Sequence, residues 1–476
     1  MLFNSPEYIL FLPIVFLLYW FVFNRRLKLQ NLLILISSYI FYGWWDWRFL
    51  SLIFLSTVVD YFVGMQIYSS KDNNVRRTYL WVSILFNIGL LGFFKYFNFF
   101  VDSWIDLLGS FGYEQKSVWT INVILPVGIS FYTFQTMSYA LDIYYNKLKP
   151  TKDFISFASF VSFFPQLVAG PIERASNLLP QILTKRVFKY DQGVQGLRLI
   201  LWGMFKKVVI ADSLGITVDS IFKNYQVFDG GVLLLGLIYF SFQIYCDFSG
   251  YSDIAIGTAK LFGIDLMSNF KFPYFSRDIG EFWRRWHISL SSWFRDYLYI
   301  PLGGSKNGRW ISIMNIIIIF VVSGFWHGAN WTFVMWGLTH ALFYIPLFMI
   351  GKNRQYITNV IADNRWFPSF KEIFQMGTTF LSTTIAWVFF RSNSISDALC
   401  YLYLMLTNLS IPQIFRSGIV FVIIICSLDW VWRKNEIDLL NIQNKYLRWS
   451  LYSGLIYLIV AYFTFFDPSQ FIYFQF

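Results

Sequence analysis

The stretch WISIMNIIIIFVVSGFWHGANWTFVMWGLTHALFYIPLFMIG, residues 310–351, contains no Lys, Arg, Asp or Glu. A helix needs about 20 apolar residues to cross a bilayer, so this stretch has room for two membrane spans. It also holds two of the three histidines of the chain, His327 and His340. Because a titratable group inside lipid is costly unless it faces a cavity or chemistry, His327 in the segment SGFWHGAN is the first functional candidate.

The composition of the whole chain is that of an integral membrane protein. Hydrophobic residues make up 56% and charged residues 14% of the 476 residues, and further uncharged runs occur at 8–23 and 449–466. A chain of this length has room for about ten to twelve spanning or re-entrant segments. We therefore predict an all-α, multi-pass membrane fold.

The charge balance and the cysteines narrow the classes of function. There are 38 Lys plus Arg against 27 Asp plus Glu, but the basic residues lie between apolar runs and form no tract. The positive-inside rule explains this excess better than nucleic-acid binding, which we do not expect. Cys246, Cys400 and Cys426 lie in or beside apolar sequence, with no disulfide framework and no zinc-ligand spacing. We expect no metal site.

Basic residues also predict the topology. The run 8–23 has no basic residue before it and no cleavage pattern after it, which indicates a retained first helix. Basic loops at 25–28, 71–77 and 147–152 then place the N-terminus outside and these loops in the cytoplasm. The short run 154–172 has basic residues on both sides, which indicates a re-entrant segment surrounded by protein or a water-filled cavity.

The segment 281–299 is predicted to be an amphipathic interfacial helix. At about 100° per residue, one face carries the apolar side chains with His287 at its edge, and the other carries the arginines. The apolar face comprises Trp283, Trp286, Leu290, Trp293, Phe294 and Tyr297, and the polar face comprises Arg284, Arg285, Ser292, Arg295 and Asp296. Either the arginines anchor the helix to lipid phosphates, or they attract an anionic donor while His287 faces a cavity.

Four ordered blocks resemble a known family. They are FFPQLVAGPI at 163–172, DFSGYSD at 247–253, FWRRWHIS at 282–289 and WHG at 326–328. These are similar to the signature blocks of membrane-bound O-acyltransferases, in particular the branch of the bacterial alginate O-acetylation membrane subunit and its peptidoglycan and polysaccharide relatives. The resemblance continues through WVFFR at 387–391 to the last residues, so it covers essentially the whole chain as one domain, 1–476.

The resemblance implies a helical bundle around a central tunnel in the bacterial cytoplasmic (inner) membrane. A cytoplasmic opening would admit a thioester donor, acetyl-CoA as co-substrate rather than a bound cofactor, and an outward funnel would admit the acceptor. It also implies a partner, a periplasmic or membrane-anchored polysaccharide acetyltransferase, besides contact with membrane lipids. The family's essential histidine falls on His327 and its accessory histidine on His287.

The chemistry expected of His327 follows from the reaction itself. A hydroxyl that attacks a thioester must lose its proton as the bond forms, and an imidazole titrates close to neutrality. The alternative for His327 is a packing histidine between helices. On an unbroken helix His340 would lie about 220° away from His327, so we interpret it as structural. Asp247 and Asp253 are expected to hydrogen-bond in the tunnel wall or to pair with arginines.

The tail 468–476, with the sequence FIYFQF at its end, leaves two alternatives open. Tyr473 is either an aromatic belt residue that anchors the last helix or, as the resemblance implies, a candidate acyl carrier. A phenol ionises near pH 10, so its ester is more reactive than that of an aliphatic hydroxyl.

The leading hypothesis is a membrane O-acyltransferase, with acetyl as the expected group and an extracytoplasmic polysaccharide such as alginate or peptidoglycan as acceptor. The alternatives are an acyltransferase acting on a protein or lipid and, from a different class, a transporter. A transporter is favoured by internal repeats, and we find no repeat in the sequence.

Overall fold

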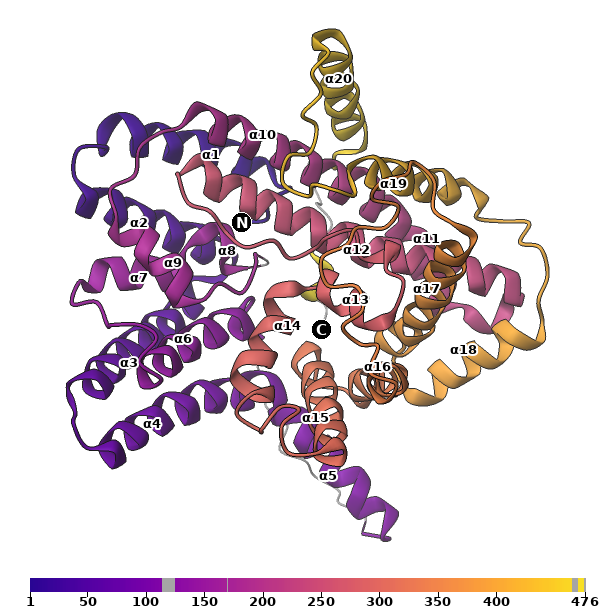
Figure 1. Cartoon of the computed structure of the whole chain (residues 1–476), viewed down its shortest axis with the longest axis horizontal. Coiled ribbons are helices and arrows are strands. Elements are labelled where there is room, and N and C mark those ends of the chain that lie inside the picture. The colour runs from indigo at the N-terminus through magenta and orange to yellow at the C-terminus, as the bar shows by residue number, and fades with distance from the viewer. Residues whose placement is uncertain (114–124, 169, 465–469, 475–476) are drawn as a thin grey trace.

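The structure is a computed structural model that describes residues 1–113, 125–168, 170–464 and 470–474 (Figure 1). All regular elements within these ranges are helical, which confirms the predicted all-α fold. The α-helices are α1 (Pro6–Leu17), α2 (Leu27–Asp46), α3 (Leu50–Ser69), α4 (Asn73–Leu91), α5 (Phe97–Ser110), α6 (Ile129–Tyr144), α7 (Phe154–Ser162), α8 (Phe164–Leu167), α9 (Ala175–Leu183), α10 (Tyr190–Met204), α11 (Asp212–Lys223), α12 (Gly230–Leu261), α13 (Ile279–Arg285), α14 (Ile288–Phe294), α15 (Arg309–His327), α16 (Trp331–Met349), α17 (Phe370–Arg391), α18 (Ile395–Thr407), α19 (Ile419–Trp432) and α20 (Lys445–Tyr462).

Short π-helical and 3-10 segments interrupt or follow these helices. The π-helical segments are η1 (Leu18–Val22), η3 (Gly92–Tyr96), η4 (Phe205–Ala211) and η7 (Arg295–Tyr299). The 3-10 turns are η2 (Trp47–Phe49), η5 (Tyr225–Val227), η6 (Pro273–Phe275), η8 (Arg416–Gly418) and η9 (Ile472–Phe474). Mid-helix departures of this kind often occur at functional sites, and η3 and η4 both lie beside the site described below.

Six helical stretches among the described residues are long and apolar enough to cross a membrane. They are Leu27–Ser69, Asn73–Ser110, Gly230–Leu261, Arg309–His327, Trp331–Met349 and Phe370–Arg391. The first two each combine two α-helices around a short η segment. The total number of spanning and re-entrant segments, and the side on which each loop lies, stay predictions.

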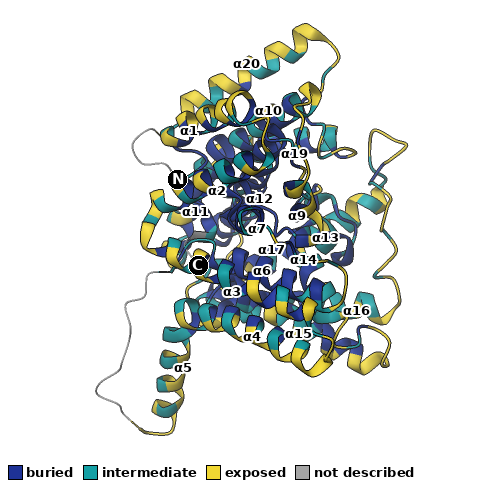
Figure 2. Cartoon of the chain, turned by 90° about the vertical axis from the view of Figure 1, so that its left-hand side faces the viewer, coloured by how far each residue is buried: buried dark blue, intermediate teal, exposed yellow. Residues whose placement is uncertain are grey.

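The long helix α12 forms the centre of the molecule and is buried over most of its length (Figure 2). It packs against α10 with almost no space between the two backbones. A Cβ atom on Gly203 would lie 2.5 Å from the carbonyl oxygen of Gly250, and one on Gly196 would lie 2.6 Å from that of Gly257. Small residues allow such close approach between membrane helices, so these glycines fix how α10 and α12 cross.

The uncharged stretch 310–351 forms the helical hairpin of α15 and α16, as its length predicted. Gly324 and Gly337 lie where the helices meet, and a Cβ atom on either would collide with a carbonyl of the other helix. The turn between them begins after His327, the last residue of α15, and Asn330 caps α16 by accepting a hydrogen bond from the amide of Thr332. His327 therefore lies at a helix end inside the bundle.

The segment 154–172 contains two helices that are too short to span a bilayer. The chain breaks at Phe163 between α7 and α8, and protein groups satisfy the backbone around this break. The amide of Phe164 donates to Ser38, Gln135 donates to the carbonyl of Phe160, and the amide of Ile172 donates to Ser289. Burial within protein is what a re-entrant segment requires, while return to the same side of the membrane stays a prediction.

The prediction of one amphipathic helix over 281–299 is wrong. The chain forms α13, breaks at His287, and continues as α14 and then η7. His287 has φ of 42°, in the left-handed region, which a helix of L-residues cannot include. Asn269 explains the break, because its carbonyl accepts from the amide of Ile288 and its side chain bonds to Ser289.

Candidate active site

Three residues that the sequence singled out lie together in the middle of the bundle. The ring centroid of His327 is 6.1 Å from that of His287 and 5.4 Å from that of Tyr473. These residues come from the end of α15, from the break between α13 and α14, and from η9 near the C-terminus. Figure 1 shows the C-terminal residues entering the middle of the molecule near α13 and α14.

Lys95, a residue that the sequence analysis missed, holds His327 in place through the backbone. Its Nζ donates to the carbonyl oxygens of Trp326 (2.8 Å) and His327 (3.0 Å), and the Tyr96 hydroxyl donates to that of Phe325 (2.9 Å). The last four carbonyls of a helix lack partners within the helix, and a cation is favoured there. Lys95 is the sole charged residue at 78–101, which could have identified it.

Aromatic rings surround the imidazole of His327. The ring centroids of Trp326 and Trp336 lie 5.0 Å away and that of Phe390 lies 5.5 Å away. Nδ1 is buried, and no described group forms a hydrogen bond with it. The ring is therefore held by packing, and its nitrogen has no competing partner among the described residues.

His287 is buried just as deeply, with the Phe248 ring centroid at 4.6 Å. Both of its ring nitrogens are buried without a hydrogen-bond partner among the described residues. Burial lowers the pKa of His287 to about 3, because the charged imidazolium loses its hydration. The ring is therefore neutral at physiological pH.

Tyr473 lies beside His327 rather than at the surface of the molecule. Its ring centroid is 4.7 Å from that of Phe248, and its hydroxyl is buried without a hydrogen-bond partner among the described residues. This position does not fit a belt residue that anchors a helix at the lipid interface. Burial raises the pKa of Tyr473 above its ordinary value, so the phenol needs a base to lose its proton. Of the predicted tail 468–476, residues 468–469 and 475–476 lie outside the described ranges.

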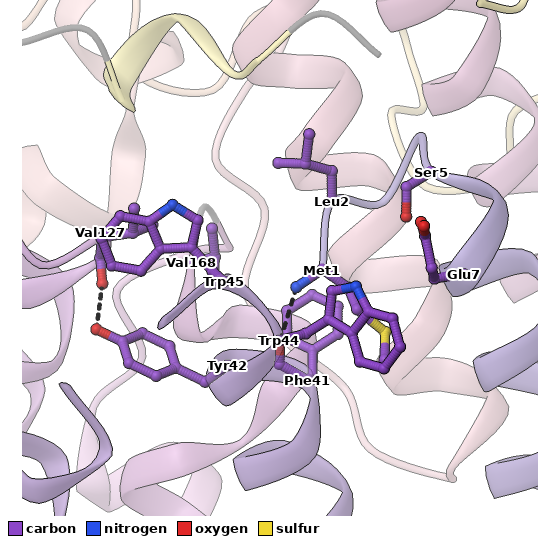
Figure 3. Close-up of a pocket in the computed structure, with 10 residues that line it drawn as sticks. All are labelled: Met1, Leu2, Ser5, Glu7, Phe41, Tyr42, Trp44, Trp45, Val127 and Val168. Atoms are coloured by element: carbon purple, nitrogen blue, oxygen red, sulfur yellow. Dashed lines mark hydrogen bonds between the residues drawn. The ribbon is translucent and has the colours of Figure 1, made fainter. Parts of the chain in front are cut away.

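One cavity lies at this cluster, and a second shares a wall residue with it. The smaller has a volume of about 50 Å³ and is lined by Lys95, Leu125, Pro126, Val127, Gly128, Ile129, Ser130, Phe131, Trp326, His327 and Tyr473. A second cavity of about 240 Å³ also contains Val127 in its wall, together with Trp44 and Trp45 (Figure 3). The Tyr42 hydroxyl donates to the carbonyl of Val127 at 2.8 Å and so fixes the wall between the two.

A larger cavity of about 460 Å³ lies along α15 between Ile316 and Ser323. Its wall includes the arginines Arg284, Arg295 and Arg354, besides many apolar side chains. Ser323 also lines this cavity and lies one helical turn before His327 on α15. The cavity thus combines three positive charges with apolar walls and extends to within one helical turn of His327.

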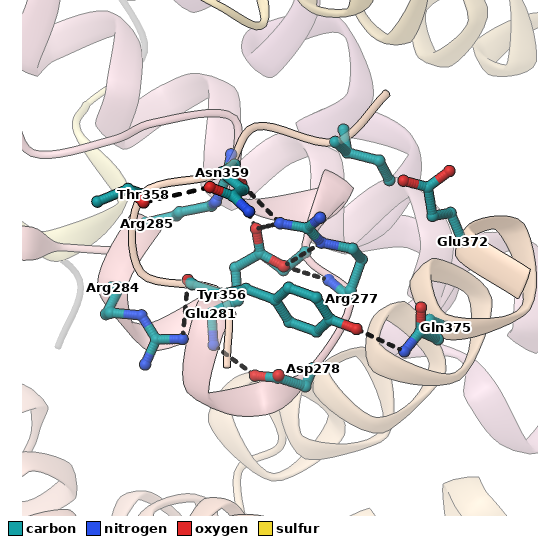
Figure 4. A network of polar contacts seen from close by, with 12 residues as sticks. Arg277, Asp278, Glu281, Arg284, Arg285, Tyr356, Thr358, Asn359, Glu372 and Gln375 are labelled. Carbon is teal, nitrogen blue, oxygen red and sulfur yellow. Dashed lines mark hydrogen bonds and ion pairs between the residues drawn. The ribbon is translucent and has the colours of Figure 1, made fainter. Parts of the chain in front are cut away.

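Arg284 and Arg285 are bound within the protein, whereas Arg295 is exposed and pairs with the adjacent Asp296. Arg284 donates to the carbonyls of Asn353 and Tyr356, and Arg285 and Arg277 both pair with the buried Glu281 (Figure 4). The Arg284 bonds attach α13 to the loop that follows α16. The Arg284 contacts are to neutral carbonyls, so its charge remains available to the large cavity.

The remaining candidates have structural surroundings. His340 is buried among aromatic rings, with the centroids of Trp283 and Trp336 each 4.9 Å away. Asp247 and Asp253 pair with Lys207 and Lys206, each at 2.6 Å, and not with arginines as one alternative expected. Among the described residues, no group of three or more His, Cys, Asp or Glu could hold a metal ion.

Comparison with known proteins agrees with the resemblance carried by the sequence blocks. Residues 40–387 match the model of MBOAT, the membrane-bound O-acyltransferase family. The chain is 40% identical to the probable alginate O-acetylase AlgI of Pseudomonas syringae pv. tomato, over 84% of this chain and 74% of the relative. It is 36% identical to the peptidoglycan O-acetyltransferase of Helicobacter pylori, over 84% of this chain and 78% of the relative.

A more distant relative acts in a different modification. The chain is 32% identical to the teichoic acid D-alanyltransferase of Streptococcus thermophilus, over 45% of this chain and 55% of the relative. The match to the family model extends over more than half of the chain and includes all four signature blocks. This multi-pass helical membrane protein, with His287 and His327 side by side in the middle of the bundle, is a member of the membrane-bound O-acyltransferase family.

Proposed function

We propose that the protein is an O-acetyltransferase that passes acetyl groups from acetyl-CoA in the cytoplasm to an extracytoplasmic polysaccharide. The observation that carries this proposal is that α15 lines two cavities, one of them at His327 itself and the other up to one helical turn before it. Ser323, one turn before it, lines the arginine-rich cavity, and His327 itself lines the small cavity that contains Tyr473. In this proposal, donor and acceptor approach the same imidazole from these two cavities.

The arginine-rich cavity is the proposed donor site. Arg309 and Lys352 flank the α15–α16 hairpin, and the positive-inside rule places them at the cytoplasmic side. Arg284 and Arg354 would attract the phosphates of acetyl-CoA, and the apolar wall would receive its pantetheine arm and thioester. Acetyl-CoA is here a co-substrate that leaves as CoA.

His327 acts as the general base in this proposal. As the acceptor oxygen attacks the thioester carbonyl, the imidazole takes the hydroxyl proton, the C–S bond breaks, and the proton passes to the departing thiolate. A positioned base of this kind contributes about 10² to 10⁴-fold to the rate. His287, whose ring lies 6.1 Å away, assists by shaping the space in which the carbonyl sits.

The first acceptor in the proposal is the hydroxyl of Tyr473. It is buried, has no hydrogen-bond partner among the described residues, and belongs to a ring 5.4 Å from that of His327. Acetylation would form a phenyl ester, whose leaving group is better than an aliphatic alkoxide. A hydroxyl of an extracytoplasmic partner enzyme would then attack this ester and carry the acetyl group to the polymer.

The acceptor polymer is inferred from the names of the relatives. Two of them are named for the acetylation of alginate and of peptidoglycan, which supports a polysaccharide acceptor. A separate polysaccharide acetyltransferase as partner and a location in the cytoplasmic (inner) membrane of a bacterium are further parts of the proposal, and they rest on the family resemblance. Acylation of a protein or a lipid is the alternative that the experiment must separate.

Mass spectrometry of envelope and secreted polysaccharides from a deletion strain tests the function. We expect one polysaccharide to lose its O-acetyl groups, and the wild-type gene but not the His327→Ala variant to restore them. Unchanged polysaccharides together with a protein or lipid that loses an acyl group would contradict the proposal. Tyr473→Phe tests the relay separately, because only the hydroxyl is lost, and full acetylation in that variant would leave direct transfer at His327.

A further inference from the structure

The C-terminal tail is bound through its backbone by the two members of one buried ion pair. Lys207 Nζ lies 2.6 Å from Asp247 Oδ1 and donates to the carbonyl of Gln470 at 3.1 Å. Asp247 Oδ2 accepts from the amide of Ile472 at 2.7 Å. The cation thus binds a tail acceptor and the anion binds a tail donor, two residues apart.

Both charged side chains are almost completely buried, with 2% of Lys207 and 4% of Asp247 exposed. Lys207 Nζ also lies 2.8 Å from Asp212 Oδ1. Buried charges are costly unless their hydrogen-bonding groups find partners. Removal of the tail would leave Asp247 Oδ2 without the bond from Ile472, so the tail and the ion pair stabilise each other.

The packing of α10 and η4 against α12 brings this pair together. The contacts of Gly196 and Gly203 with α12 place the two backbones side by side just before η4 begins. In η4, Lys206 and Lys207 are adjacent and both buried, and each pairs with an aspartate of α12. The ion pairs therefore follow from the glycine contacts.

Aromatic packing continues from the ion pair to the active site. Phe471 is fully buried, with its ring centroid 4.6 Å from that of Tyr251 on α12. Phe248, on the same helix, contacts Phe471, Tyr473 and His287, at centroid distances of 5.6, 4.7 and 4.6 Å. Because Ile472 is bonded to Asp247, the next residue of the tail arrives beside Phe248 and His327.

We propose that Lys207 and Asp247 form a clasp for residues 470–472 and thereby set Tyr473 beside His327. Both are positioning residues, since they act on the tail backbone and not on the reacting atoms. The catalytic part of this inference rests on the proposed role of Tyr473, whereas the docking of the tail does not.

The neighbouring pair of Lys206 and Asp253 provides a matched control. It has the same chemistry, comes from the same two elements and has the same 2.6 Å separation. Its other hydrogen bond goes to Ser249 on α12, at 2.8 Å, and not to the tail. Replacing both members of a buried pair by apolar residues avoids an uncompensated charge and is often neutral for stability.

The experiment compares two variants of the full chain, purified in detergent. Lys207→Met/Asp212→Asn/Asp247→Leu removes the clasp without leaving Asp212 as an unpaired charge, and Lys206→Met/Asp253→Leu removes the control pair. The first measurement is the rate at which carboxypeptidase releases Tyr473, followed by mass spectrometry of the C-terminal peptide. The second is polysaccharide O-acetylation in cells.

We expect release of Tyr473 to accelerate at least about tenfold in the clasp variant, equivalent to about 1.4 kcal/mol of lost docking, and acetylation to fall with it. The control variant should release Tyr473 at the wild-type rate. Equal rates in the clasp variant and the wild type, or equal acceleration in both variants, would overturn the clasp. Rapid release with undiminished acetylation would keep the clasp and overturn the relay through Tyr473.

A single change in the tail keeps the test independent of the folding of the bundle. Ile472→Pro removes the backbone N–H that donates a hydrogen bond to Asp247, and it leaves the charges of Lys207 and Asp247 in place. Ile472 is the first residue of η9, a position at which the fixed φ of proline is tolerated. We expect Ile472→Pro to reproduce the faster release, and full protection of its tail would count against the clasp.

Discussion

The two histidines of the site are held by different kinds of backbone. His327 ends a regular helix of 19 residues whose last carbonyls are bound by Lys95, so its position follows from a rigid element and one cation. His287 lies in a helix break with φ of 42°, held by the bonds that Asn269 makes with the next two residues. His327, the proposed base, needs an exact position and is held by a rigid helix. The strained backbone at His287 instead allows a second imidazole to pack beside it.

Loss of the rigidly held ring should have the largest effect. We expect His327→Ala to be inserted and folded but to lose about 10² to 10⁴-fold in polysaccharide acetylation, because the general base is gone. Quantitative O-acetyl analysis, with size-exclusion chromatography to check folding, provides the measurement. Near-normal acetylation would show that His327 is not the general base. The different backbone supports of His327 and His287 would then have no catalytic meaning.

Replacement of His287 should cost less, about tenfold in acetylation, since its ring shapes the site without taking the proton. Two variants separate the ring from the backbone: His287→Ala loses both the ring and a residue tolerant of positive φ, whereas His287→Asn loses only the ring. Equal acetylation by both would assign the effect to the ring. Full activity of His287→Asn would show instead that the backbone break is what matters.

Lys95→Met tests the rigid support itself. The side chain keeps its length and loses the donors to the carbonyls of Trp326 and His327, so we expect a few-fold loss of acetylation. Unsatisfied buried carbonyls should also lower the free energy of unfolding by about 1 to 3 kcal/mol. Thermal unfolding in detergent, with Lys95→Arg as the charged control, measures this. Unchanged stability and activity would mean that α15 needs no cation at its end.

The smallest effect is expected for the third histidine. His340 packs between Trp283 and Trp336 and lies outside the cluster around His327. His340→Phe keeps an aromatic ring in this space, and we expect acetylation within about twofold of wild type and a stability change below about 1.5 kcal/mol. A loss as large as that of His287→Ala would mean that the site extends further along α16 than the cavities indicate.

The helices that lie in long uncharged apolar runs were predictable from the sequence. The uncharged residues 310–351 had to form two spans, and His327 stood out because a lone titratable group in such a run is costly. The same reasoning failed at 281–299, where one continuous helix was predicted. Hydrogen bonds from Asn269, which is distant in the sequence, decide where the chain breaks there. Local periodicity contains no information about such partners.

The sequence predicted which residues form the candidate site, but it did not predict how they are arranged in space. The resemblance pointed to His327, His287 and Tyr473, but their proximity depends on the tail returning to α12. Lys95 was visible as one charge in an apolar run, yet its role depends on two carbonyls of a helix more than 200 residues later. The pairing of Lys206 and Lys207 with aspartates likewise required the crossing of α10 and α12.

The π-helical segment η4 has a consequence for how the gene can change. Its wider turn allows two consecutive lysines to face buried partners, whereas consecutive residues of an α-helix point about 100° apart. Deletion of the codon for Phe205 would favour an ordinary α-helix and turn every later residue of this element, Lys206 and Lys207 included, by about that angle. Such a deletion keeps the apolar composition yet breaks both lysine–aspartate pairs together. We therefore expect alleles with a changed length of this segment to be rarer among functional genes than alleles with substitutions in it.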